Sequence, residues 1–179
     1  MQKVLCALYV FIYLFLLTLC GCQSSSVQKQ KSLVTDFSAD FCAEYNDMKL
    51  KGSVVSDRHG LIGINITSPD TIAGLSVNYK GGETELKRDS LICSADEAYL
   101  PSGSFPNLIK NILKGISDGR AELSAQNGEN SFYNLKTDNG TCIITADKSG
   151  NIAEAKIENE KFYIQFSEPK FLENKDSTK

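Results

Sequence analysis

The sequence is poor in the residue types on which catalysis and metal binding depend. It holds a single histidine, His59, and no cysteine or serine nucleophile can be tied to it. Cysteine and histidine are never paired at the short intervals typical of a zinc site. We therefore expect a non-enzymatic protein with no catalytic residues, no metal and no cofactor.

A basic excess is also lacking. Lys3 is the only charged residue among the first 21, so 18 basic and 22 acidic residues follow it, a formal charge of −4. A mildly acidic chain without a basic stripe is a poor binder of nucleic acid or of an anionic lipid surface. Nucleic acid is thus excluded as an expected partner, and any membrane contact must come from another source.

The first 21 residues have the layout of a secretory signal peptide. Lys3 precedes an almost uninterrupted apolar run from Val4 to Leu19. As a helix this run would span about 24 Å, short of the roughly 30 Å hydrocarbon core. Short tilted spans exist, so length alone leaves a permanent anchor open.

The residues after the apolar run favour cleavage. Leu19-Cys20-Gly21-Cys22 resembles the lipobox of bacterial lipoproteins, with an apolar residue at −3, a small one at −1 and cysteine at +1. The resemblance implies that the Cys22 sulfur takes a diacylglyceryl group and that Cys22 becomes the mature N-terminus. Cys20 is the alternative, but Leu19 before it is a poor fit for the small position.

Two or more acyl chains would hold the mature chain stably, since each buried methylene adds about 0.8 kcal/mol. The polar stretch after Cys22, up to Ser32, has almost nothing to bury and is typical of a flexible tether. We expect residues 22–32 to tether the folded domain to the extracytoplasmic face of the cell membrane.

Three cysteines remain in the body of the chain: Cys42, Cys93 and Cys142. Outside the cytosol two of them could form a disulfide and leave one free thiol. Alternatively, all three are small buried or half-buried hydrophobic residues. Sequence alone does not choose a pair.

Residues 33–171 have the length of one domain, and apolar and polar residues alternate with period two almost throughout. Residues 172–179 are polar and are expected to form a disordered tail. The alternation predicts strands near residues 37–45, 48–54, 62–66, 75–79, 83–86, 91–93, 121–126, 131–137, 141–146, 152–158 and 162–167.

The alternation breaks once, after Pro106. Apolar residues then follow a helical spacing that closes near Gly119, at positions 108, 109, 112, 113 and 116. Such a helix has one apolar stripe and must lie on a sheet. The sequence thus predicts a mainly β (α+β) fold, with one large twisted antiparallel sheet and one packed amphipathic helix.

Several segments resemble a known family. They are Ile66-Thr67-Ser68-Pro69 with Ala73-Gly74-Leu75, Tyr99-Leu100-Pro101 before the helix, Asp147 to Ile152, and Phe162 to Phe166. This pattern is similar to small lipoproteins of Gram-positive anaerobes related in fold to the Lol-type lipoprotein carriers and receptors. The resemblance implies a sheet curled into an incomplete barrel, with the helix on its concave face.

A concave face that exceeds what the helix covers would leave a groove for acyl chains or apolar segments. The candidate lining residues are Phe37, Phe41, Tyr45, Ile62, Ile64, Ile66, Leu75, Val77, Tyr79, Phe162, Ile164 and Phe166. For any one of these residues, a place in the core is the first expectation, because an alternating apolar stripe usually marks the buried face of a strand.

Two functions follow from these alternatives. The first is a membrane-anchored module that binds a lipid, an acyl chain or an apolar partner segment. The second is a structural or interaction lipoprotein with a filled concavity and no small ligand.

The lipid anchor is directly testable. We expect Cys22→Ala to abolish incorporation of labelled fatty acid, such as palmitate, and to leave the precursor unprocessed, because the acceptor sulfur is gone. Membrane sedimentation and fatty-acid labelling measure this. Processing and labelling of Cys22→Ala that match the wild type would show that the lipobox interpretation is wrong.

Overall fold

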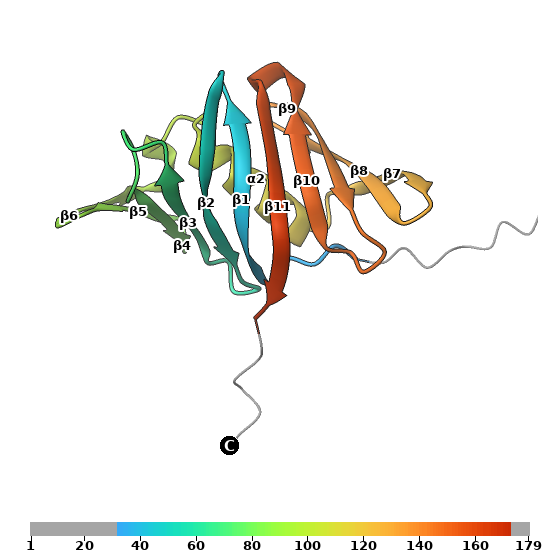
Figure 1. Cartoon of the computed structure of the whole chain (residues 1–179). Coiled ribbons are helices and arrows are strands. Elements are labelled where there is room, and N and C mark those ends of the chain that lie inside the picture. Colours follow the sequence, from blue (N-terminus) through green and yellow to red (C-terminus); the bar gives the residue numbers. More distant parts are fainter. Residues whose placement is uncertain (1–31, 173–179) are drawn as a thin grey trace, which may run out of the picture. The chain divides into compact units, whose positions relative to one another are not determined.

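The computed structural model of the chain describes residues 32–172 (Figure 1). The expected signal peptide, Cys22, the tether up to residue 31 and the tail from residue 173 lie outside the described residues. The strands are β1 Phe37–Tyr45, β2 Met48–Ser56, β3 Ile62–Ser68, β4 Ser76–Lys80, β5 Glu83–Arg88, β6 Leu91–Asp96, β7 Glu122–Asn127, β8 Asn130–Thr137, β9 Gly140–Ala146, β10 Ile152–Ile157 and β11 Phe162–Phe171. The helices are α2 Phe105–Ser117 and the 3₁₀ turns η1 Glu97–Tyr99 and η2 Glu158–Glu160.

All the strands join in one antiparallel sheet, in the order β6-β5-β4-β3-β2-β1-β11-β10-β9-β8-β7. Starting at β1, the chain adds strands outward by hairpins until it reaches β6 at one edge. It then crosses the sheet through α2 to β7 at the other edge and returns inward to β11, which pairs with β1. Figure 1 shows the sheet curling around the side on which α2 lies. The predicted fold class is confirmed.

Helix α2 forms where the sequence predicts it and buries its apolar stripe. Pro106 stands in its first turn, and Gly119 follows its end with a positive φ of 70°. Leu108, Ile109, Ile112 and Leu113 are each 1% exposed. The helix therefore fills the space above the inner face of the sheet.

An aromatic cluster anchors the start of α2. The Phe105 ring lies 5.7 Å from that of Phe41, 6.0 Å from that of Tyr45 and 5.9 Å from that of Phe162, centroid to centroid. The Tyr45 hydroxyl also donates a 2.6 Å hydrogen bond to the carbonyl of Gly103. Because β1 and β11 supply these rings, the helix start is fixed on the central strands.

The period-two alternation holds along the central strands. In β1 the residues from Phe37 to Ala43 alternate strictly between the core and the outer face. Met48 is the exception on the inward face of β2: it is 43% exposed, because it stands opposite Tyr45 at the turn end of the β1–β2 hairpin. The inward Gly52 is required by crowding, since an added Cβ would collide with the Asn65 carbonyl oxygen.

Two turns have the same geometry in the two halves of the sheet. The Asp57 carboxylate accepts hydrogen bonds from the backbone N–H of His59 and Leu61, and the Asp147 carboxylate accepts them from Ser149 and Asn151. Each closes a turn with a glycine three residues after the aspartate. The Gly150 carbonyl of the second turn also accepts from the N–H of Val34, which ties the start of the domain to this turn.

The cysteine alternatives are resolved by position. Cys42, Cys93 and Cys142 are free thiols; Cys42 and Cys93 are exposed, whereas Cys142 is buried. The interpretation of all three as buried or half-buried is therefore wrong for two, because Cys42 lies on the outer face of β1 and Cys93 on an edge strand. Burial raises the pKa of the Cys142 thiol to about 12, which makes it unreactive at neutral pH.

The Asp147 turn yields a pH-dependent prediction. Partial burial opposes ionisation of Asp147, but hydrogen bonds from Asn151, Ser149 and Gly150 outweigh it and hold its pKa below the usual value of 3.8. We expect Asp147→Ala to lower the free energy of unfolding by about 1 kcal/mol at pH 7, because two turn N–H groups lose their acceptor.

A group with a lowered pKa stabilises the fold above its unfolded pKa, and that contribution disappears as the pH falls through the folded pKa. The difference between wild type and variant should therefore shrink below about pH 4. Urea denaturation at both pH values measures it. Asp138→Ala, in the neighbouring hairpin turn, is the matched control, and an equal loss in the control would contradict the assignment.

Candidate functional site

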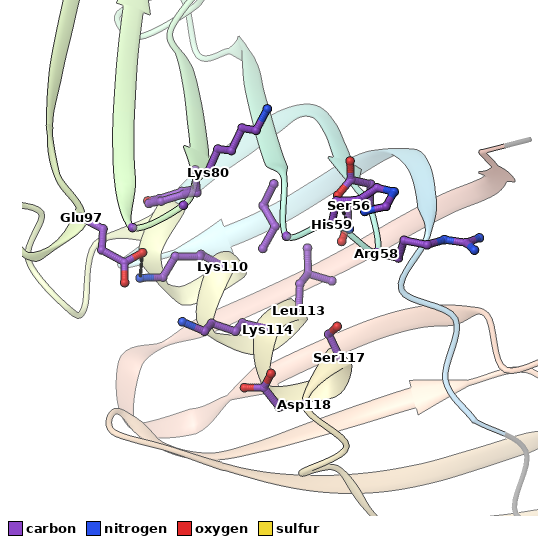
Figure 2. A pocket seen from close by; sticks show the side chains of 16 residues that line it. Ser56, Arg58, His59, Lys80, Glu97, Lys110, Leu113, Lys114, Ser117 and Asp118 are labelled. Atoms are coloured by element: carbon purple, nitrogen blue, oxygen red, sulfur yellow. Dashed lines mark hydrogen bonds and ion pairs between the residues drawn. The ribbon is translucent and has the colours of Figure 1, made fainter. Parts of the chain in front are cut away.

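A cleft of about 440 Å³ opens beside the C-terminal half of α2 (Figure 2). Its walls are the β2–β3 turn, the β4–β5 turn, η1 and the helix. The residues that line it are Ser56, Asp57, Arg58, His59, Gly60, Ile62, Tyr79, Lys80, Gly81, Gly82, Glu97, Lys110, Leu113, Lys114, Ser117 and Asp118. The volume is that of a small-molecule site.

The floor of the cleft is apolar but offers little surface. Ile62, Tyr79 and Leu113 meet there, and they are only 6%, 2% and 1% exposed. These three residues are therefore mainly core residues, and only a small part of each reaches the cleft. A ligand held here would contact mainly the polar rim.

A buried hydrogen-bond network fixes one wall. The Tyr79 hydroxyl donates to Asn107 Oδ1 at 3.0 Å, and Asn107 Nδ2 donates to the carbonyls of Leu100 and Pro101, each at 2.9 Å. Asn107 is 3% exposed, and its one buried amide bonds to three polar groups on two other segments. Burial, with a smaller contribution from the nearby charge of Glu97, raises the pKa of Tyr79 well above its usual value, so Tyr79 stays a neutral donor.

The Lys110 side chain lies along the same wall of the cleft. Its Nζ lies 3.4 Å from Glu97 Oε2 and 5.3 Å from the centroid of the Tyr79 ring (Figure 2). The residue is 9% exposed, and a lysine this buried requires a partner for its charge. The carboxylate and the ring face together supply one.

The charged side chains of the β2–β3 turn already have partners within the protein. Arg58 donates through Nε and Nη2 to Asp36 Oδ2 at 2.9 and 2.7 Å, so its guanidinium turns away from the cleft (Figure 2). The Asp57 carboxylate is occupied by turn N–H groups. His59 is exposed beside them.

Two cations on the rim remain without a partner. Across the described residues, neither Lys80 nor Lys114 forms an ion pair, whereas the acidic residues of the cleft are engaged with Lys110, with Arg120 or with backbone N–H groups. The rim therefore carries uncompensated positive charge above a small apolar floor. This arrangement suits an anionic group on an amphipathic molecule.

The predicted groove residues lie together, but most are covered. Ten of the twelve are at most 7% exposed and pack beneath α2 or beside it, and Tyr45 and Leu75 are half-buried against the same core. Of the twelve, Ile62 and Tyr79 line the cleft. The structure thus places the twelve residues together in or against the core, and only these two at the cleft.

The histidine, cysteine and acidic side chains of the described residues do not gather at one site. Within residues 32–172, no group of three or more His, Cys, Asp or Glu side chains is placed to hold a metal ion. No hydrogen bond in that range joins His59 to a serine or cysteine. Asp36, Asp40 and Glu44, which share one polar strand face in the sequence, do not converge: Asp36 pairs with Arg58, and Asp40 and Glu44 are exposed. No helix in this range is long and apolar enough to span a bilayer.

The rim lysines escaped sequence reasoning because they come from separate segments. Lys80 stands at the end of β4, beside a hairpin turn, and Lys110 and Lys114 stand one helical turn apart on α2. The i, i+4 spacing of two lysines beside the apolar stripe was the only local signal. Nothing local indicates that Lys80 shares a cleft with them.

Comparison with known proteins identifies the fold alone. No family model and no curated protein matches the chain. An uncharacterized conserved protein from Thermus thermophilus superposes with a TM-score of 0.51 at 10% identity, covering 76% of this chain and 78% of that one. Looser similarity extends to a LolA superfamily protein from Nitrosomonas europaea (TM-score 0.39, 12% identity, 83% and 89% coverage) and to a DUF1329 family protein from Desulfovibrio piger (0.45, 10%, 80% and 88%).

The Asn107 network predicts a stability effect. We expect Asn107→Ala to lower the free energy of unfolding by about 2–3 kcal/mol, because the buried Tyr79 hydroxyl and two part-buried carbonyls lose their partner. Asn111→Ala on the same helix, where the side chain makes no such bonds, should change it by less than about 0.5 kcal/mol. Denaturant unfolding followed by circular dichroism compares them, and equal effects would overturn this role of Asn107.

Proposed function

We propose that this chain is a membrane-anchored extracytoplasmic lipoprotein whose sheet domain is a non-enzymatic binding module. The anchor is the lipid on Cys22, and the similarity of Leu19 to Cys22 to a lipobox supports it. The location is the extracytoplasmic face of a cell membrane of the single-membrane, Gram-positive type. The resemblance of the turn and strand motifs to Lol-type lipoproteins also supports this proposal.

The observation that carries the binding function is the cleft beside α2. It combines an apolar floor with two lysines that lack ion pairs in the described range, so it fits the polar end of an amphipathic lipid with an anionic headgroup. The headgroup would contact Lys80 and Lys114, and the first carbons of the chain would meet the small part of Ile62 that reaches the cleft. The module thus holds the head of a lipid instead of enclosing a whole acyl chain.

A second candidate is favoured by one specific observation. The concavity is filled, since Phe37, Phe41, Ile64, Val77 and Ile164 are each at most 2% exposed. A filled concavity supports an interaction lipoprotein that takes no small ligand and acts through its outer surfaces. Co-purification distinguishes the two candidates.

The experiment is native mass spectrometry of gently purified protein that lacks the signal peptide and Cys22. We expect one anionic phospholipid or fatty acid per chain in the wild type. Lys80→Glu/Lys114→Glu should weaken binding of an added anionic phospholipid about five- to thirtyfold, because two attractive contacts become repulsive.

Lys51→Glu/Lys136→Glu is the matched control, since both lysines are exposed, lack ion pairs in the described range and lie outside the cleft. This control should bind as the wild type does. Repeated absence of any lipid in the wild type would reject the lipid-binding module and favour the interaction lipoprotein. Equal weakening in both double variants would show that binding follows net charge and not the cleft.

A further inference from the structure

The two edges of the sheet are built differently. At the β7 edge the pairing with β8 shifts register between Leu123 and Ala125, and the exposed side chains of the strand are mainly polar. At the β6 edge the pairing with β5 runs through six residue pairs without a shift, from Leu91 to Asp96. Bulges and polar side chains are the usual means by which proteins prevent edge-to-edge pairing. The β7 edge has both, whereas the β6 edge has no register shift and begins with two exposed apolar side chains.

Strand β6 exposes apolar side chains along this open edge. Leu91 is 76% exposed and Ile92 is 61% exposed, and Cys93 is exposed next to them. No charged residue occurs between Leu91 and Ala95. Such an edge requires a partner strand, or it remains a site of uncontrolled association.

The backbone of β6 is oriented to accept one. The Glu97 N–H donates to the Gly82 carbonyl on the β5 side, so the odd-numbered residues of β6 face β5. Ile92, Ser94 and Asp96 therefore direct their N–H and C=O groups to the open edge. Their side chains lie on the outer face, whereas those of Leu91, Cys93 and Ala95 lie on the inner face with Leu86.

The β5–β6 hairpin also has a charge polarity. Lys87 and Arg88 stand at the turn end, opposite Ile92 and Leu91, and Glu83, Glu85 and Asp96 gather toward the other end. Antiparallel pairing of two copies sets the acidic end of one hairpin beside the basic end of the other. Parallel pairing would bring like charges together, which is unfavourable.

We infer that β6 is a homodimer interface, in which the β6 edges of two copies pair antiparallel about a two-fold axis at Cys93. In this register Leu91 faces Ala95 of the second copy on the inner face, and Ile92 faces its Ser94 on the outer face. The two Leu86 side chains extend the apolar strip on either side. The contact is isologous and closes at two copies, as symmetric dimers do. This inference does not depend on the lipid or on the cleft.

This register predicts the position of one thiol. Cys93 faces its own counterpart at a pair that is not hydrogen-bonded, where Cα atoms of antiparallel strands lie about 4.5 Å apart. That separation falls within the range of about 4.4–6.8 Å that a disulfide spans. Cys42, an exposed thiol on a central strand, provides the internal control.

The test uses the full chain in isolated membranes, treated with copper(II)–phenanthroline. Two copper(II) complexes accept one electron each and become copper(I), two thiols lose two protons, and one S–S bond forms. Non-reducing gels should show a dimer band in the wild type and in Cys42→Ser, and no such band in Cys93→Ser. A dimer band that requires Cys42, or none in the wild type, would overturn the proposal.

A second pair of variants tests the backbone. Ser94→Pro removes an N–H that points to the open edge and leaves the bonds to β5 intact, so we expect loss of the Cys93 cross-link; Ser94→Ala keeps the N–H and should retain it. Protection of the buried Cys142 from a maleimide confirms that each variant is folded. A folded Ser94→Pro that cross-links as well as wild type would rule out pairing through β6.

Discussion

The structure depends on one constraint: the chain must cross from β6 to β7, the two opposite edges of its own sheet, and α2 makes that crossing. An amphipathic helix on this route has to lie on the inner face, and it buries nine of its residues there. The position of the helix also determines which surfaces of the sheet stay accessible. The helix fills the concavity, leaves a cleft where its C-terminal half meets two hairpin turns, and stops short of the β6 edge.

Because the interior is filled, the groups that remain accessible to a ligand are mainly polar side chains at the rim of the cleft. The inner-face side chains satisfy one another and α2, so recognition has to use groups that the core does not need. Lys80 and Lys114 are such groups, because they stand at a cleft and lack ion pairs in the described range, whereas Lys110 and Arg58 are committed to Glu97 and Asp36. A lysine with a carboxylate partner is part of the scaffold, and one without a partner is available to a ligand.

Sequence periodicity predicted the sheet and the helix well, because alternation and helical spacing are local signals. Phe37 to Ala43 and Leu108 to Ile116 show the expected faces. What it could not predict depends on contacts between distant segments. The cleft joins a hairpin, a second hairpin and a helix, and the Asn107 amide bonds to Tyr79 across 28 residues. The exposure of Cys93 follows from strand order, which the alternation of a single strand does not reveal.

The strand order has a consequence for how the domain is completed. The first strand, β1, and the last, β11, pair at the centre of the sheet, and Phe37 lies opposite Phe171. A chain that is synthesised from its N-terminus presents β1 long before β11, its central partner, has been made. Until β11 arrives, β1 has only β2 beside it, and the seam that joins the two halves cannot close. Such a contact, between residues far apart in sequence, is slow to form, so the two halves of the sheet join only after the last strand is available, and the unpaired edge of β1 is open to wrong pairing until then.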